Sequence, residues 1–271
     1  MCLALPAAAQ ITIAHISDTH LGLKRAPQAA GNLRRVVEMV NQRHPDAVIV
    51  SGDIGENPQA WRQAQEILSK LRGPVYYVPG NHDESTLTIE RYRSVFGKNY
   101  YEFKVKNATF FALDSQLLGN FDVFESRRAM PLTAIGKVES GRMLDWFGRQ
   151  IDETMQEHSA QAHGGAGGNP GLVFVVQHVP ISCNRGFPPD PKPYWTVQEP
   201  YRSREIELLH RLGVKHVFAG HWHAGMVFQA DGITYHVAPA TSWSPFDYPL
   251  GFAIHTISGN GDVKTEFVKL K

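Results

Sequence analysis

The sequence contains very little cysteine. Its 271 residues include only Cys2 and Cys183, which lie far apart in the chain. Two such residues make no disulfide framework and supply no set of thiolates for a metal ion. A scaffold held together by disulfides and a cysteine-based zinc site are therefore excluded.

Long apolar runs and an excess of one charge are also missing. No stretch reaches the roughly 20 apolar residues that a membrane-spanning helix needs, so we expect no membrane span. The 27 basic and 26 acidic residues give a net charge of +1, which provides no general attraction for nucleic acid. With 42% apolar residues, the chain can form one sizeable α/β domain or two small ones. These numbers leave the oligomeric state open.

Residues 1–9 fit two interpretations. They end in small residues at Ala7–Ala9, as at a signal-peptide cleavage site, but no basic region precedes their short apolar part. They are either the remnant of a signal peptide or a disordered N-terminus. A cytoplasmic location and an exported or periplasmic one therefore both stay open. The domain itself is expected over residues 10–271.

Several apolar runs in the chain end abruptly in polar residues. The run Val75–Val78 stops at Gly80 and is followed at once by Asn81, His82 and Asp83. Taken alone, this cluster suits a polar turn that caps the next helix. It suits equally well a ligand site at the carboxyl end of a parallel strand, where α/β folds place their ligands.

The same arrangement recurs four more times. The polar residues that follow the other apolar runs are Asp18 with His20, Asp53, His178, and His221 with His223. Side chains alternate along a strand, so Asp-x-His and His-x-His place both ligands on one face. Imidazole and carboxylate groups bind Zn, Mn and Fe. Two such ions about 3.5–4 Å apart need a bridging carboxylate, and the pair can clamp a displacement at phosphorus.

Apolar periodicity and turn residues predict the elements between these clusters. Strands are expected at 11–16, 47–50, 75–78, 172–176 and 216–219, a hairpin over 100–113, and further β stretches near 233–238, 251–257 and 262–270. Helices are expected at 31–44, from Pro58, near 86–96, at 139–155 and at 201–212, with a linker over 158–171. The alternation of strand and helix in the first half predicts a parallel sheet with crossover helices.

The five clusters resemble the calcineurin-like metallophosphoesterase superfamily in order and spacing. The matching motifs are Asp18-x-His20, Gly52-Asp53, Gly80-Asn81-His82-Asp83, His178 and Gly220-His221-x-His223. Other segments, such as Gln177–Ile181 and Phe218–Gly225, resemble the branch of calcineurin-like phosphoesterase domain-containing proteins described as Ser/Thr phosphatases.

The resemblance implies an α/β fold, a single-domain, four-layer α/β/β/α sandwich. We expect the strands at 11–16, 47–50, 75–78 and 108–113 in one sheet. The strands at 172–176 and 216–219 and the C-terminal β stretches are expected in the other. Helices would cover both outer faces, because apolar strands need burial on both sides.

The resemblance also implies roles for individual residues. One metal ion would be held by Asp18, His20, Asp53 and His223, and the other by Asp53, Asn81, His178 and His221. The two ions would be Mn, Fe, Zn or Ni. His82 would stabilise or protonate the leaving oxygen, and Asp83 would orient it by accepting its other N–H. Glu56 and Asn57 fit either a supporting role or the N-terminus of a helix.

The implied activity is hydrolysis of phosphate esters by a metal-activated water. Phosphomonoesters, including those of phosphoproteins, are the preferred substrates, and a 3′,5′-cyclic nucleotide phosphodiesterase is the alternative. A non-catalytic scaffold is disfavoured because all seven ligand positions hold the expected residue types. In the proline-rich loop 183–200, Arg185 is either a phosphate contact or a solvated arginine. Tyr194 and Trp195 form either a substrate wall or loop packing.

Overall fold

Two β-sheets form the centre of the molecule, which we describe from a computed structural model covering residues 10–83, 88–163 and 171–270. The strands are β1 Ile11–Ile16, β2 Ala47–Ser51, β3 Val75–Val78, β4 Tyr101–Val105, β5 Ala108–Ala112, β6 Leu172–Val176, β7 His216–Ala219, β8 Met226–Ala230, β9 Ile233–Val237, β10 Gly251–Ile257 and β11 Val263–Lys269. The helices are α1 Ala29–Asn41, α2 Pro58–Leu68, α3 Ile89–Phe96, α4 Ala134–His163 and α5 Tyr201–Leu212, with 3₁₀ turns η1 Ser115–Leu117 and η2 Pro193–Trp195.

The strand order brings the predicted polar clusters to one edge. The first sheet has the order β11-β10-β1-β2-β3, and the second has the order β4-β5-β6-β7-β9-β8. The neighbours β1, β2 and β3 are parallel, and so are β6 and β7 in the second sheet. The five strands that precede the clusters therefore end on the same side of their sheets, as ligand-binding α/β folds require.

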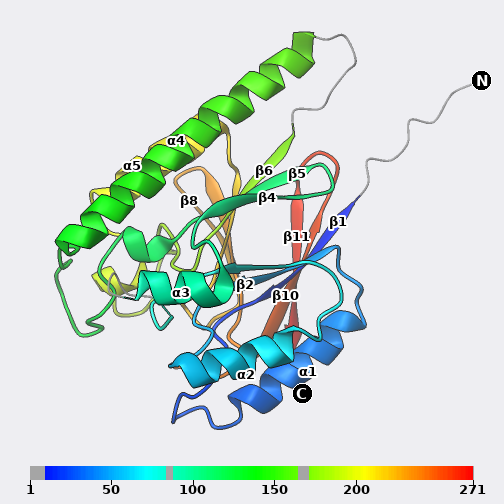
Figure 1. The fold of residues 1–271 in the computed structure, drawn as a ribbon, viewed down its shortest axis with the longest axis vertical. Helices are drawn as coiled ribbons and strands as arrows, with labels where there is room; N and C mark the ends of the chain where they lie inside the picture. The colour runs from blue at the N-terminus through cyan, green and yellow to red at the C-terminus, as the bar shows by residue number, and fades with distance from the viewer. Residues whose placement is uncertain (1–9, 84–87, 164–170, 271) are drawn as a thin grey trace, which may run out of the picture.

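Helices cover the outer face of each sheet, which confirms the predicted four layers (Figure 1). The apolar side of α1, including Leu33 and Val36, packs with α2 against Val48 and Val50 of the first sheet. On the other side of the molecule, the long helix α4 lies next to α5 over the second sheet. Within the described residues, no helix combines the length and the apolar composition needed to cross a membrane.

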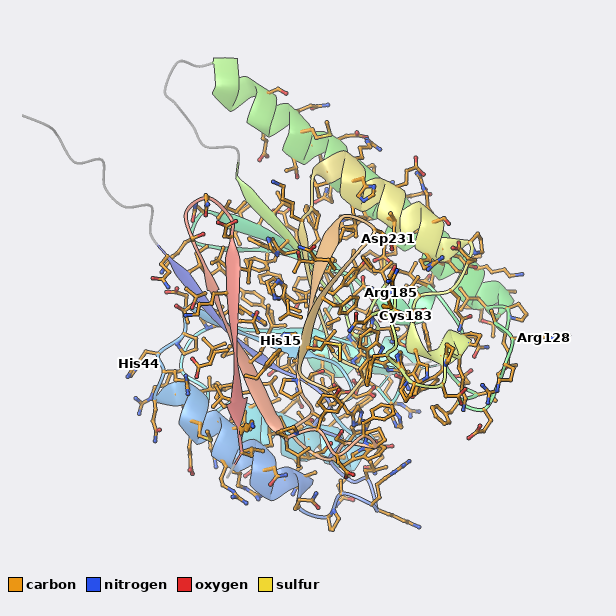
Figure 2. All side chains as sticks on the ribbon, turned by 180° about the vertical axis from the view of Figure 1, so that it is seen from behind. His15, His44, Arg128, Cys183, Arg185 and Asp231 are labelled. Carbon is orange, nitrogen blue, oxygen red and sulfur yellow. The ribbon has the colours of Figure 1, made fainter. Side chains whose placement is uncertain are left out.

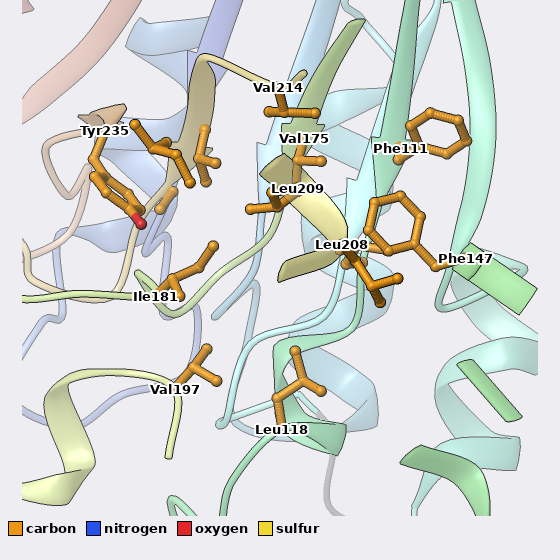
Figure 3. Close-up of a cluster of buried hydrophobic side chains, with 14 of the residues drawn as sticks. Phe111, Leu118, Phe147, Val175, Ile181, Val197, Leu208, Leu209, Val214 and Tyr235 are labelled. Carbon is orange, nitrogen blue, oxygen red and sulfur yellow. The ribbon is translucent and has the colours of Figure 1, made fainter. Parts of the chain in front are cut away.

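Two further apolar cores complete the layers. Phe147 of α4 and Leu208 of α5 pack with Phe111 and Val175 of the second sheet, as Figure 3 shows. Between the sheets lies a third core, which contains Phe110, Phe174 and Phe218 together with strand residues of the first sheet. The central strands of each sheet are thus buried on both faces, which explains why they are almost continuously apolar, whereas the edge strands β4, β8 and β11 have exposed residues next to buried ones.

The predicted membership of three strands was wrong. β5 belongs to the second sheet, where it pairs in parallel with β6, whereas β10 and β11 belong to the first. β10 runs antiparallel to β1, with Ile257 opposite Ile11. An apolar run indicates that a strand is buried, but it carries no information about its neighbour. The short strand β8, whose residues Val227 and Gln229 are exposed, was not predicted at all.

Helix α4 is longer than the predicted 139–155. It begins at Ala134, where the Thr133 hydroxyl accepts a hydrogen bond from the Gly136 N–H at 3.0 Å, and it continues to His163. The first part of the predicted linker is therefore helical, and its residues 164–170 lie outside the described residues. The same is true of residues 1–9 and of 84–87, where the predicted helix near 86–96 was to begin.

Four histidines and one threonine form a continuous hydrogen-bonded chain between the sheets, which we call the histidine chain. Its links run in the order His15, His255, Thr265, His236 and His216, with donor–acceptor distances of 3.1, 2.9, 2.7 and 3.0 Å. Burial lowers the pKa of His15 and of His236 to about 3 and that of His255 well below its ordinary value. These three imidazoles are therefore neutral in the folded protein, and Figure 2 shows His15 in the interior.

The histidine chain predicts an acid-sensitive fold. In the unfolded protein a histidine takes up a proton below its ordinary pKa of 6.5, whereas folded His236 does so only near 3. Its contribution to stability is therefore complete above pH 6.5 and is lost as the pH falls, by about 1.4 kcal/mol per pH unit. His236→Phe lacks this contribution. We therefore expect the slope of its unfolding free energy against pH to be smaller than that of the wild type by up to about 1.4 kcal/mol per pH unit.

Urea unfolding between pH 7 and pH 4.5 measures this dependence. The control is His44→Gln, which removes an exposed histidine and should leave the slope of the wild-type protein unchanged. A His236→Phe slope equal to that of the wild type would contradict the assignment of a neutral buried imidazole.

Candidate metal centre

The backbone at the strand ends adopts a conformation that few residues tolerate. Positive φ angles occur at Asp18 (53°), His20 (42°), Asp53 (51°), His221 (68°) and His223 (52°). Such left-handed conformations cost about 1–3 kcal/mol each outside glycine and cluster at functional sites. They turn five of the seven predicted ligands away from the strand direction and toward a common point.

The predicted ligands of the first ion meet in one buried group. One ligand atom each from Asp18, His20, Asp53 and His223 lie within 4.8 Å of one another. His223 Nε2 is 3.1 Å from Asp18 Oδ1 and from His20 Nε2. His20 Nε2 lies 3.4 Å from Asp53 Oδ2. Four donors from three different turns, those after β1, β2 and β7, therefore surround one position.

The second group shares Asp53 with the first. Ligand atoms of Asp53, His178 and His221 again lie within 4.8 Å of one another, and His178 Nε2 is 3.3 Å from Asp53 Oδ2. Asn81 lines the same cavity as His221, and its Nδ2 donates to the Tyr194 hydroxyl at 3.0 Å. Asp53 thus stands where a bridging carboxylate is expected.

Hydrogen bonds on the second ring nitrogen orient three of the imidazoles. His178 Nδ1 donates to the Ser51 carbonyl at 2.6 Å, and His223 Nδ1 donates to the Trp243 carbonyl at 2.7 Å. His20 Nδ1 is bonded to a carboxylate oxygen of Glu56 at 2.8 Å. Each bond fixes the tautomer and turns Nε2 toward the centre of the group, as in metal sites of known proteins.

The site contains buried polar atoms that form no hydrogen bond, although two of them lie 3.1 and 3.3 Å from a group of opposite charge. Asp18 Oδ1, Asn81 Oδ1 and His178 Nε2 are buried without any hydrogen-bond partner. Leaving such atoms unpaired costs about 1–3 kcal/mol each, and more for a charged group. The other oxygen of Asp18 is held by the Ser17 hydroxyl at 2.6 Å and by the His221 N–H at 3.1 Å. These three atoms belong to predicted ligands, so the residues fit a pair of cations.

Two glycines of the motifs are required because oxygen atoms of neighbouring side chains occupy the space that a Cβ atom would need. A Cβ atom at Gly80 would lie 2.2 Å from Asp53 Oδ1, and one at Gly220 would lie 1.9 Å from Ser17 Oγ. Both distances are far below van der Waals contact, so any side chain there would displace a predicted ligand or its support. The glycines of the motifs therefore serve the position of the carboxylates.

Opposite charges hold the buried carboxylates ionised. Burial alone would raise the pKa of Asp53, but attraction to His178 and His82 outweighs burial and keeps it well below its usual value. Burial lowers the pKa of His178, while attraction to Asp53 raises it to a net value of about 9. A proton on His178 therefore balances the charge of Asp53, and a bound ion would take its place.

Glu56 connects the predicted acid to the predicted metal ligands. Its Oε2 is 2.9 Å from His82 Nδ1, while its Oε1 binds His20. Of the two interpretations of Glu56, the supporting role is the one observed. Asn57 takes the other role, since its Oδ1 accepts hydrogen bonds from Gln59 N–H and Ala60 N–H at the start of α2.

The predicted hydrogen bond from His82 to Asp83 is not formed, because Glu56 takes that place. The Asp83 carboxylate instead accepts backbone N–H groups of Ile54, Gly55 and Gly80 at 2.8–3.1 Å. Burial and the neighbouring charge of Asp53 raise the pKa of Asp83 to about 7. Asp83 therefore ties the turn after β3 to the turn after β2.

A cavity of about 580 Å³ opens over these residues. It is lined by His20, Asn81, His82, His221 and His223, and beyond them by aromatic side chains and Arg25. Tyr194 and Trp195 both line it, which favours the substrate-wall interpretation of this pair.

The two arginines differ in their relation to the cavity. Arg185 is exposed and does not line it; Figure 2 shows it beside Cys183. Its role as a phosphate contact stays a prediction. Arg25, whose guanidinium lies 4.3 Å from the ring centre of Trp243, was not predicted, because no motif distinguishes it from a solvated arginine.

Removing the shared carboxylate should affect both predicted ion positions. We expect Asp53→Asn to reduce the metal content below about one ion per chain, since two cations would then face each other without a bridge. His221→Gln should reduce chiefly one of the two. Elemental analysis after Mn²⁺ loading measures both, with exposed Asp145→Asn as the control. Full metal content in Asp53→Asn would refute the bridging role.

Comparisons with known proteins agree with this geometry. The sequence model of the calcineurin-like phosphoesterase family matches residues 11–225. A serine/threonine-protein phosphatase CPPED1 of Danio rerio is 24% identical over 242 residues, covering 84% of this chain and 70% of that protein. A probable cyclic nucleotide phosphodiesterase of Fibrobacter succinogenes is 24% identical over 250 residues, covering 85% of this chain and 80% of that protein.

Among solved structures, a dimetal phosphatase from Danio rerio has the same fold. It superposes with a TM-score of 0.62 and 17% identity, covering 95% of this chain and 98% of that one. The four-layer fold that the sequence motifs predict is thereby confirmed. The family match extends over most of the chain and includes every strand that ends in a polar cluster. The chain belongs to the calcineurin-like phosphoesterase family.

Proposed function

We propose that this metal-dependent phosphoesterase hydrolyses phosphomonoesters. The observation that carries the proposal is that Arg25 and His82 line the same cavity as the predicted metal ligands. Burial lowers the pKa of His82, but attraction to Asp53 and the hydrogen bond to Glu56 raise it to a net value of about 9, so both side chains are cationic. A monoester dianion carries one more ionisable oxygen than a diester, so it gains more from positive groups beyond the metal ions. The similarity to a protein named a serine/threonine phosphatase supports the same choice.

We further propose which residues hold the ions. Asp18, His20 and His223 would hold one and Asn81, His178 and His221 the other, with Asp53 between them. The donors are imidazole nitrogens and carboxylate or amide oxygens, a set suited to Mn, Fe, Zn or Ni. Such a pair, when bound, polarises the phosphoryl group and activates water.

His82 would supply the proton to the leaving oxygen. Its Nδ1 is engaged by Glu56, and its ring lines the cavity. Nε2 is therefore the nitrogen that remains to face the substrate. Glu56 keeps the proton on Nδ1, so the ring can donate from Nε2 and remain a neutral imidazole afterwards. Because Glu56 also binds His20, the acid and a metal ligand are held at a fixed separation.

A 3′,5′-cyclic nucleotide phosphodiesterase is the second candidate. The aromatic residues Tyr194 and Trp195 line the cavity, where they could stack on a nucleobase. One relative is also named a probable cyclic nucleotide phosphodiesterase. The two candidate functions predict opposite orders of hydrolysis rate: a phosphomonoesterase cleaves a monoester faster than a cyclic diester, and a cyclic nucleotide phosphodiesterase does the reverse.

Arg25→Ala tests the choice of substrate. We expect kcat/KM for p-nitrophenyl phosphate to fall by about 10- to 100-fold, because a hydrogen bond to a charged group is worth roughly 1.5–3 kcal/mol. The loss should be clearly smaller for bis-p-nitrophenyl phosphate. Arg185→Ala, measured alongside, decides between the two arginines. If cyclic AMP turns over faster than any monoester in the presence of Mn²⁺, the monoesterase proposal is wrong.

His82→Ala tests the proton donor. Its turnover should fall by about 10²–10⁴-fold while its metal content stays that of the wild type. The loss should be larger for phenyl phosphate than for p-nitrophenyl phosphate, whose leaving group needs less protonation. Loss of metal from His82→Ala would make it a ligand, and an equal loss for both esters would remove it from the proton transfer.

A further inference from the structure

The cavity over the metal centre has walls made of aromatic rings. Six aromatic side chains line it, and we call them the ring subsite: Phe121, Phe124, Tyr194, Trp195, Trp243 and Phe246. They come from three separate segments, near residues 121–124, 194–195 and 243–246. Metallophosphoesterase chemistry at a metal pair does not require any of them, so their convergence calls for a separate explanation.

The rings begin directly beside the predicted ligands. The Tyr194 ring centre lies 4.7 Å from that of His221, and the Trp243 ring centre lies 4.8 Å from that of His223. A group attached to a phosphate at the metal centre would therefore enter the space between these walls. Phe124 extends the wall outward. Its ring lies edge-to-face to those of Tyr194 and Trp195, with ring centres 5.1 and 5.4 Å apart.

Beyond the predicted ligands and His82, the charged residues that line the cavity are Arg25, Asp122 and Asp190. Asp190 is engaged by Arg127 and lies 3.6 Å from Lys192, so its charge is already balanced. The Arg25 guanidinium lies over the Trp243 ring. A phosphoserine in a peptide would bring amide groups into this space, and each amide left without a partner would cost about 1–3 kcal/mol. A flat ring needs no such partners and gains from stacking.

We infer that the ring subsite binds a planar aromatic ring on the ester group of the substrate, so that the enzyme acts on small aryl or heteroaryl phosphate esters. This inference rests on the proposed phosphomonoesterase function and names its substrate class. The cavity volume of about 580 Å³ is in the range of sites for small molecules, roughly 300–1,000 Å³. The ring could be a simple aryl group or a nucleobase, since both offer a flat face.

Matched ligand pairs that differ only in the ring test the subsite. Phenylphosphonate and methylphosphonate carry the same non-hydrolysable phosphorus group, and the non-hydrolysable phosphonate analogues of AMP and ribose 5-phosphate differ only in the base. We expect calorimetry with Mn²⁺-loaded protein to show at least one pair in which the ring tightens Kd by about 10- to 100-fold. A preference in the first pair identifies a simple aryl ring, and one in the second a nucleobase. No preference in either pair would overturn the inference.

Phe124→Ala assigns the preference to the ring subsite. Phe124 is 43% exposed and belongs to no apolar core, so its removal should leave the fold intact. We expect the ring preference to fall by about three- to tenfold, with Kd for methylphosphonate unchanged. The control is Val227→Ala, which removes a 45% exposed side chain on β8 outside the cavity. A preference that persists in full in Phe124→Ala would contradict the assignment.

The hydrolysis of p-nitrophenyl phosphate separates the two proposals. If the protein binds the ring-bearing ligand more tightly but hydrolyses no monoester, the ring subsite stands and the proposed function fails. If it hydrolyses monoesters without any ring preference, the proposed function stands and the ring subsite fails.

Discussion

The burial of two carboxylates, Asp18 and Asp53, is the constraint on which the rest of the site depends. Both are almost completely removed from water, at 0% and 1% exposure, where an uncompensated negative charge costs several kcal/mol. The chain supplies compensation from every side: the Ser17 hydroxyl, the backbone N–H groups of His82 and His221, and a shell of imidazoles. This compensation is incomplete at the predicted ion positions, where Asp18 Oδ1, Asn81 Oδ1 and His178 Nε2 form no hydrogen bond.

The two-sheet architecture is what makes this burial possible. Asp18 and Asp53 follow strands of the first sheet, whereas His178, His221 and His223 follow strands of the second. The relative position of the sheets therefore sets the ligand distances. The apolar core between the sheets and the histidine chain both fix that position. Because the histidine chain crosses from β1 to β7, a shift between the sheets would break hydrogen bonds as well as apolar contacts.

The sequence predicted the parts of the site that are encoded locally. A ligand such as His20 could be identified because a buried strand, a turn and a fixed spacing are all visible within ten residues. Glu56 could not be decided, because an acidic residue before a helix has an equally good explanation at the helix N-terminus. The family resemblance implied that Asp83 binds His82, while its buried carboxylate turns toward backbone N–H groups 28 and 29 residues earlier. Sheet membership failed for the same reason, since β5 and β10 find their partners through contacts far along the chain.

The residues that local sequence motifs identify would carry the chemistry, whereas the residues that no motif identifies would set the substrate selectivity. The groups that would hold ions and move a proton stand on strand ends, where the backbone is fixed by the sheets. The aromatic walls and Arg25 stand on loops, which can change without disturbing the strands beneath them.

Trp195 shows how the two parts are joined. Its carbonyl accepts the Trp222 indole N–H at 2.8 Å, and Trp222 is fully buried and stands between His221 and His223 in the sequence. The core side of the turn after β7 thus anchors the loop that carries the substrate wall. A change in substrate preference would therefore be expected to arise in the loops first, with the buried carboxylates and their imidazoles left as they are.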